Sequence, residues 1–286
     1  MTLKLRALEV LRALLFVLLG IGLYFLLAIG ATQAGLVQQG NGTIDSPGFL
    51  ISGLIALVSM VGATFFMCMI RGEPVGEVGF ADPNPRRKVA FGFLWGGVIV
   101  TLAVLIPWMA HHESLAGPNA SAKVVAIGGL RLFGGLAPQS AAEEMFLRGY
   151  ALAHLRRGVG NIPAVLLTGT VFGVLHLTNP NSTWVAAANI SLVGVFLGAL
   201  VIRTGSIWMA IGLHISWNWF EGFFYGHPVS GIAAGTALVR QTAFDESLWT
   251  GGKFGPEASL PTAIVLAGCL AAVLFWPRER KPTSVV

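Results

Sequence analysis

The stretch LLFVLLGIGLYFLLAIGA spans residues Leu14 to Ala31 and contains no charged side chain. A helix that crosses a bilayer needs about 20 mostly apolar residues, and this run approaches that length. It is also longer than the ~7–15 residues of a signal-peptide core. Lys4, Arg6 and Arg12 precede it. We therefore expect an uncleaved first membrane helix whose basic flank stays on the cytoplasmic side.

The composition of the whole chain agrees with a membrane location. The 286 residues are 55% hydrophobic and only 11% charged, whereas soluble domains carry about 25% charged residues. The mean hydropathy is +0.74. The net charge of +5 could suggest nucleic acid, but the basic residues lie in short clusters between apolar runs. That arrangement is typical of membrane topology, so we expect lipid around the protein and no nucleic-acid partner.

Apolar runs of spanning length recur along the chain, and the basic residues alternate with them. Most Lys and Arg residues fall on the side of the N-terminus, and the opposite loops hold only Lys123, Arg240 and Lys253. By the positive-inside rule both termini are then cytoplasmic. We predict an all-α fold, a polytopic membrane helical bundle of about eight transmembrane helices, forming a single integral-membrane domain over residues 1–286. The predicted spans are 11–32, 49–70, 90–110, 124–152, 161–178, 184–203, 206–226 and 261–277.

Two parts of this plan are irregular. The fourth span is long and polar in its second half, so it is a candidate for a broken helix or for two helices, and Pro138 inside it can kink it. The loop 227–260 is the largest segment outside the predicted helices, and its residues indicate no chemistry. Gly-x-x-x-Gly pairs, such as Gly92/Gly96 and Gly169/Gly173, let helices approach closely. We expect them to pack helices inside the bundle.

Ionisable and amide side chains interrupt the apolar spans at one depth. A charge at the centre of a bilayer costs roughly 2.5–3.5 kcal/mol on insertion scales. Counting about 1.5 Å of helical rise per residue from the basic ends of the predicted helices, the five polar residues named below fall in one layer in the middle of the bilayer. They come from three different helices. Such residues are functional-site candidates by default. They are Glu143, Glu144, His176, His214 and Asn218.

The spacing within each helix also favours one shared cavity. Glu144 and Arg148 are four residues apart, acid first, which is the favourable order for a helical ion pair. Phe172/His176 and His214/Asn218 have the same spacing on later helices. Three further residues, Glu221, His154 and His227, are expected at the cavity rim or the membrane interface.

The residue types favour attack by water on a carbonyl group. A carboxylate can act as general base, and His176 could share a water molecule with Glu143 and polarise it. His214 and Asn218 can donate hydrogen bonds to a developing oxyanion. The chain has no His-Glu-x-x-His and no Gly-x-Ser-x-Gly, which makes zincin and serine-hydrolase plans less suitable.

The three motifs Glu-Glu-x-x-x-Arg, Phe-x-x-x-His and His-x-x-x-Asn occur in this order on successive predicted helices. The pattern resembles the family of CAAX prenyl proteases and bacteriocin-processing enzymes (CPBP), also called the abortive-infection family of intramembrane proteases. The resemblance covers residues 124–226, the expected catalytic core. It implies that Glu143 and His176 activate water, that His214 and Asn218 hold the oxyanion, and that Glu144 and Arg148 orient the site.

Phe172 is expected to shape the cavity wall. The family has been described both as metal-dependent and as glutamate-based. Two histidines and two carboxylates could hold a divalent metal such as zinc, and the sequence leaves the need for a metal open. If a metal is present, we expect Glu143, His176 and His214 as its ligands.

Three functions remain open from the sequence. The leading hypothesis is a multi-pass endopeptidase of the cell membrane that uses activated water on a membrane-associated peptide or protein, including prenylated CAAX-type substrates. The second is a non-catalytic immunity or scaffold protein of the same fold. The third, a proton-coupled transporter, would be favoured by inverted repeats, which the sequence lacks.

Overall fold

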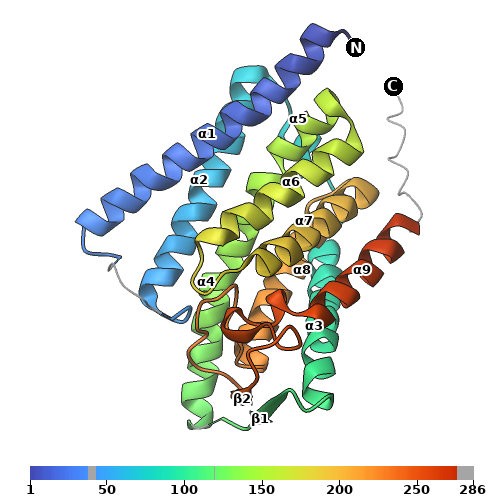
Figure 1. Ribbon diagram of the computed structural model, residues 1–286. Helices are drawn as coiled ribbons and strands as arrows, with labels where there is room; N and C mark the ends of the chain where they lie inside the picture. The colour runs from blue at the N-terminus through green and yellow to red at the C-terminus, as the bar shows by residue number, and fades with distance from the viewer. Residues whose placement is uncertain (38–42, 119, 276–286) are drawn as a thin grey trace.

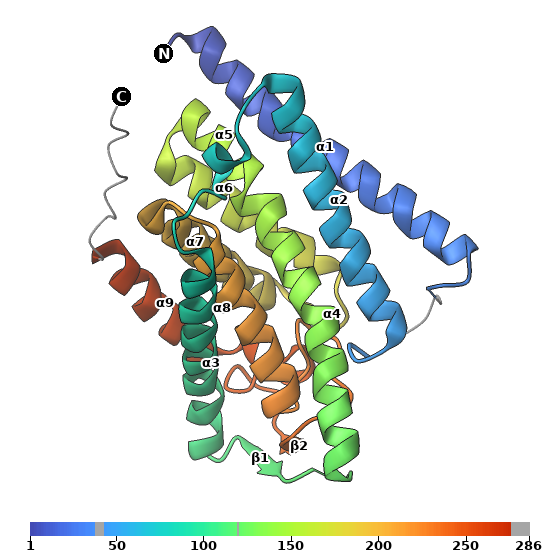
Figure 2. The same cartoon turned by 180° about the vertical axis from the view of Figure 1, so that it is seen from behind.

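The computed structural model describes residues 1–37, 43–118 and 120–275, and these are mostly helical (Figures 1 and 2). Within these described residues, five helical segments are long and apolar enough to cross a membrane: Leu3–Gln33, Pro47–Arg71, Pro85–Met109, Asn161–Thr178 and Trp184–Thr204. The protein is therefore a multi-pass membrane protein. The predicted count of eight spans and the sidedness of the termini are not established by these helices and stay predictions. The end of the last predicted span, residues 276–277, lies outside the described residues.

The helices follow the predicted spans closely at most ends. The first three are α1 (Leu3–Gln33), α2 (Pro47–Arg71) and α3 (Pro85–Met109). They are followed by α4 (Ala122–Arg148), α5 (Tyr150–Val159) and α6 (Asn161–Leu175), which the 3-10 turn His176–Thr178 extends. The last are α7 (Trp184–Thr204), α8 (Trp208–Trp219), which the π-helical turn Phe220–Phe224 extends, and α9 (Leu260–Phe275).

The predicted span 124–152 divides into two helices, and the break lies at Gly149 rather than at Pro138. Helix α4 continues through Pro138 and ends at Arg148, and α5 begins at Tyr150. A Cβ atom at Gly149 would lie 2.6 Å from the carbonyl oxygen of Met145. Only glycine therefore fits the backbone at this corner. The corner ends α4 directly after the predicted Glu-Glu-x-x-x-Arg motif.

The all-α expectation was incomplete, because the segment 227–260 contains a strand. β1 (Glu113–Ala116) and β2 (Arg240–Phe244) form an antiparallel pair with an irregularity between Ser114 and Leu115. A short 3-10 turn, Pro256–Ala258, leads into α9. The strands join two loops that were predicted on the side opposite the cytoplasm. We call residues 227–260 the far-side segment.

Helices α4 and α8 run through the middle of the bundle, with α1 and α2 on one side and α3 and α9 on the other (Figures 1 and 2). Close backbone contact fixes α8 against α3. A Cβ at Gly92 would lie 2.1 Å from Met209 O, and one at Gly96 would lie 2.3 Å from Leu213 O. The predicted role of this glycine pair in internal packing is therefore confirmed.

Candidate active site

A cavity of about 310 Å³ lies between these helices, and the predicted site residues meet on its wall. Glu143 comes from α4, His176 from the end of α6, and His214 and Asn218 from α8. Apolar side chains of α4, α6, α7 and α8 provide most of the remaining wall. The titratable side chains that line the cavity are Tyr24, Glu143, His176, His214 and Glu257. The wall contains no lysine or arginine among the described residues.

Adjacent glutamates on α4 face different surroundings because successive helical residues are rotated by about 100°. The Glu143 side chain is 26% exposed and faces the cavity. Its Oε1 accepts a hydrogen bond of 2.8 Å from Gln139 Nε2, one helical turn earlier. The Glu144 side chain is fully buried. The two carboxylates therefore have separate tasks, one facing the cavity and one facing the protein interior.

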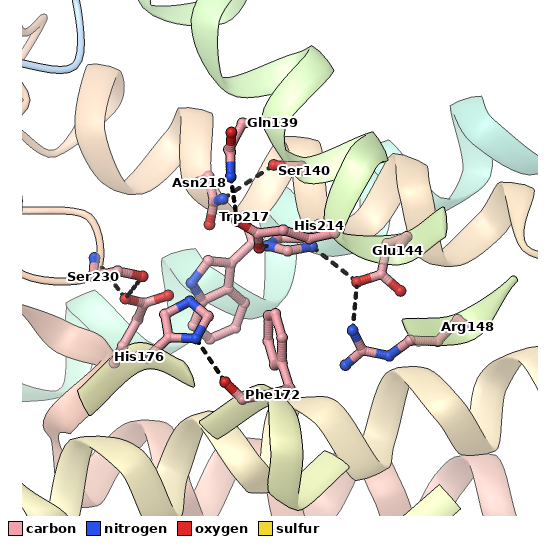
Figure 3. Close-up of polar contacts among 12 residues, drawn as sticks. Gln139, Ser140, Glu144, Arg148, Phe172, His176, His214, Trp217, Asn218 and Ser230 are labelled. Carbon is pink, nitrogen blue, oxygen red and sulfur yellow. Dashed lines mark hydrogen bonds and ion pairs between the residues drawn. The ribbon is translucent and has the colours of Figure 1, made fainter. Parts of the chain in front are cut away.

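Glu144 connects α4 to α8 through a single oxygen. Its Oε1 lies 3.2 Å from Arg148 Nη1 and 3.0 Å from His214 Nδ1 (Figure 3). The predicted Glu144–Arg148 ion pair is thus present, and both side chains are fully buried. The guanidinium carbon of Arg148 also lies 4.4 Å from the centre of the Phe172 ring, a cation–π contact. Arg148 therefore supports both the glutamate and the aromatic wall.

Hydrogen bonding fixes the proton arrangement of His214. Because a carboxylate accepts, Nδ1 carries the hydrogen that bonds to Glu144. The other ring nitrogen, Nε2, lies 3.7 Å from Glu143 Oε2. His214 is 6% exposed, so its ring is held between the two glutamates of α4.

His176 lies at the end of α6 instead of within it. The α-helix ends at Leu175, and His176 is the first residue of the 3-10 turn. Its Nδ1 donates a hydrogen bond of 2.7 Å to Phe172 O. The Phe172 ring stands edge-on to both histidines, 4.6 Å from His176 and 5.8 Å from His214 between ring centres (Figure 3). These ring contacts agree with the predicted wall-shaping role of Phe172. Because Nδ1 of His176 carries the hydrogen bonded to Phe172 O, its Nε2 is able to accept a hydrogen bond.

Asn218 faces α4 from one helical turn after His214. Its Nδ2 donates a hydrogen bond of 3.1 Å to Ser140 Oγ. Its Oδ1 is buried without a hydrogen-bond partner in the described part of the chain. The amide is therefore anchored by one of its two N–H groups.

Sequence reasoning missed several polar residues at this cavity. Gln139 lines the cavity, and Ser140 is buried against Asn218, which lines it. Both lie just before the glutamates and could have been found from their helical spacing. Glu257 comes from the far-side segment, where no chemistry was predicted. Its Oε2 accepts hydrogen bonds of 2.7 Å from Ser230 N and 2.8 Å from Ser230 Oγ, and Asn179 Nδ2 donates to Ser230 O. Only the folded chain brings these residues to the cavity.

Three residues predicted at the rim are instead buried. His154 Nδ1 lies 2.6 Å from a Glu9 carboxylate oxygen. His227 Nε2 lies 2.7 Å from Glu113 Oε2, and Glu221 Oε2 accepts from Trp217 Nε1 at 3.0 Å. The prediction was wrong because the pairing partners are distant in sequence or hidden from solvent by helix packing.

The side chains do not gather as a metal-binding set. Among the described residues, no group of three or more His, Cys, Asp or Glu side chains could hold a metal ion. The conditional ligands Glu143, His176 and His214 share the cavity, and Nδ1 of each histidine is already engaged in a hydrogen bond.

Comparison with known proteins agrees with the position of this site. Residues 122–220 match the family described as type II CAAX prenyl endopeptidase, Rce1-like. The matched region runs from α4 to the end of α8 and includes all seven predicted site residues. The chain is also 29% identical over 214 residues to the uncharacterized protein YyaK of Bacillus subtilis (strain 168), covering 70% of each chain. Residues 122–220 therefore form an Rce1-like type II CAAX prenyl endopeptidase family domain.

Proposed function

We propose that the protein is an intramembrane endopeptidase of the cell membrane that hydrolyses a peptide bond with a water molecule activated by Glu143. The observation that carries this proposal is the Glu143 carboxylate on the cavity wall, 3.7 Å from Nε2 of His214. A carboxylate so located can remove a proton from water. The family match supports peptide-bond hydrolysis as the reaction.

The first step is the attack of water on the carbonyl carbon of the substrate. Glu143 accepts one proton of the water as the new C–O bond forms. His176 can accept a hydrogen bond from the other water hydrogen, because its Nδ1 is used by Phe172 O and its Nε2 retains a lone pair. Two acceptors then orient the same water toward the carbonyl.

The second step stabilises the negative oxygen and breaks the C–N bond. The free N–H of Asn218 is one donor for the oxyanion. His214 can donate from Nε2 only as the imidazolium, since Nδ1–H is already bonded to Glu144. The Glu144 carboxylate at Nδ1 and the oxyanion at Nε2 would then compensate the imidazolium charge. When the C–N bond breaks, Glu143 transfers its proton to the leaving amine.

We propose a membrane-associated peptide or protein as the substrate. The cavity wall is built largely from apolar side chains of membrane helices, among them Phe49, Leu136 and Phe196, and an apolar wall suits a lipid-modified or membrane-embedded segment. A prenylated CAAX-type substrate fits both this wall and the family match. Cleavage of paired synthetic peptides, with and without a farnesyl group, tests the lipid requirement.

The proposal is tested without assuming a substrate. Wild type and Glu143→Ala are reconstituted separately with membrane extract of the native host, and new peptide termini are profiled by mass spectrometry. Termini that appear only with the wild type support proteolysis at this site. Identical profiles from two folded proteins refute it and favour the non-catalytic scaffold.

A further inference from the structure

Among the described residues, the Asn218 amide forms its side-chain hydrogen bond with the hydroxyl of Ser140. Ser140 Oγ accepts from Asn218 Nδ2 at 3.1 Å, and the two side chains come from α4 and α8 (Figure 3). Ser140 is fully buried and Asn218 is 7% exposed. Water therefore has little access to replace this contact.

The position of Ser140 on α4 gives the contact a geometric consequence. Ser140 lies three residues before Glu143 and four before Glu144, so one helical turn carries all three side chains. Each faces a group across the cavity or on α8: Ser140 the Asn218 amide, Glu143 the Nε2 of His214, and Glu144 the Nδ1 of His214. A rigid turn of helix thus sets the distances between the proposed base and the proposed oxyanion donors.

An oxyanion donor is effective only if its direction is fixed before the reaction. An asparagine side chain has two rotatable bonds, and its amide has two N–H groups. If one N–H is tied to Ser140, the amide cannot turn, and the second N–H keeps one direction. Without the Ser140 hydroxyl, the amide must be reoriented at each turnover, which raises the barrier to catalysis.

We propose that Ser140 is a positioning residue for this reaction, whose hydroxyl holds the Asn218 amide in the orientation needed to bind the oxyanion. The inference rests on the proposed function, because it assigns Ser140 a role only through Asn218. It lies outside the Glu-Glu-x-x-x-Arg, Phe-x-x-x-His and His-x-x-x-Asn motifs.

Ser216 on the neighbouring helix α8 provides a matched control for Ser140. Ser216 lies on α8 two residues before Asn218, is fully buried like Ser140, and its hydroxyl has no hydrogen-bond partner among the described residues. Ser216→Ala and Ser140→Ala each remove one buried oxygen atom from a helix. Only Ser140→Ala removes a contact to a proposed catalytic residue.

The test is a double-mutant cycle in proteoliposomes, using a peptide that carries the cleavage site found by terminus profiling. We expect Ser140→Ala to lower kcat about tenfold or more, with KM within about twofold. Ser216→Ala should leave both constants within about twofold. Ser140→Ala combined with Asn218→Ala should cleave no more slowly than Asn218→Ala alone, because the hydroxyl acts through the amide. Thermal midpoints identify any variant that is unfolded.

The outcomes separate this inference from the proposed function. If Asn218→Ala lowers kcat and Ser140→Ala matches the Ser216→Ala control, the role of Ser140 is refuted and the proteolytic site stands. If the two losses multiply in the double variant, Ser140 acts independently of Asn218 and the inference is also overturned. If Glu143→Ala retains full cleavage, the proposed function itself fails.

Discussion

Arg148→Met removes the positive charge that faces Glu144 inside the bundle. Both side chains are fully buried, and Arg148 Nη1 lies 3.2 Å from Glu144 Oε1. Breaking a buried ion pair by removing one partner costs about 3–5 kcal/mol, because it leaves an uncompensated charge. The cation–π contact with Phe172 is lost as well, which adds about 0.5–2 kcal/mol. We expect the free energy of unfolding to fall by about 3 kcal/mol or more.

A second substitution separates stability from activity. Glu144→Leu combined with Arg148→Met replaces both charges by apolar side chains, which is often nearly neutral for stability. The double variant should therefore regain most of the stability lost by Arg148→Met. The double variant should not cleave the peptide, because His214 no longer has the carboxylate that binds its Nδ1.

The measurements are denaturant unfolding in mixed micelles and peptide cleavage in liposomes. Lys253→Met is the matched control, since Lys253 pairs with Glu246 at a similar 3.1 Å but both side chains are 63% exposed. Such a surface pair contributes about 0–1 kcal/mol. The reasoning is refuted if Arg148→Met costs no more than this control, or if the double variant cleaves at the wild-type rate.

Three further predictions concern residues around the site. Gln139→Leu removes the hydrogen bond to Glu143 and should slow cleavage about tenfold without unfolding the protein; an unchanged rate contradicts it. Glu257→Ala removes the acceptor of two hydrogen bonds in the far-side segment and should lower stability by about 1–3 kcal/mol in denaturant unfolding, whereas no loss would make these bonds irrelevant. The hydroxyl of Ser247, and then His112, hold the pKa of Asp245 below its ordinary value of 3.8. Because the folded-state pKa is depressed, these contacts stabilise the far-side segment above pH 3.8 and are lost only as the pH falls below it. The expected sign is a change in tryptophan fluorescence below pH 3.8 that Asp245→Asn abolishes, and a change well above pH 4 would contradict the prediction.

The apolar runs could be read from the sequence because lipid requires long apolar helices with internally bonded backbone. Regular spacing likewise indicated the Glu144–Arg148 pair, which depends only on helical geometry. The meeting of Glu143, His176 and His214 on one cavity wall agrees with the common depth counted from the basic helix ends. The length of the apolar runs, the spacing of residues along one helix and the count from each basic end were sufficient for these features.

Contacts between distant segments could not be predicted in this way. Ser140 meets Asn218, and His154 meets Glu9, only because α4, α5 and α8 pack against partners far along the chain. Strands β1 and β2 are too short to show an alternating pattern. The position of the break at Gly149 depends on the Met145 carbonyl lying beside its Cα, whereas α4 continues through Pro138, where the sequence predicted a kink and no break.

The central claim is that Glu143 removes a proton from water during peptide-bond hydrolysis. The most direct test is the cleavage rate of Glu143→Gln in liposomes, because glutamine keeps the shape of the side chain and can still contact Gln139. The account predicts a loss of about 100-fold or more, as expected for a missing general base, with an unchanged thermal midpoint. Cleavage within tenfold of the wild-type rate would contradict the account.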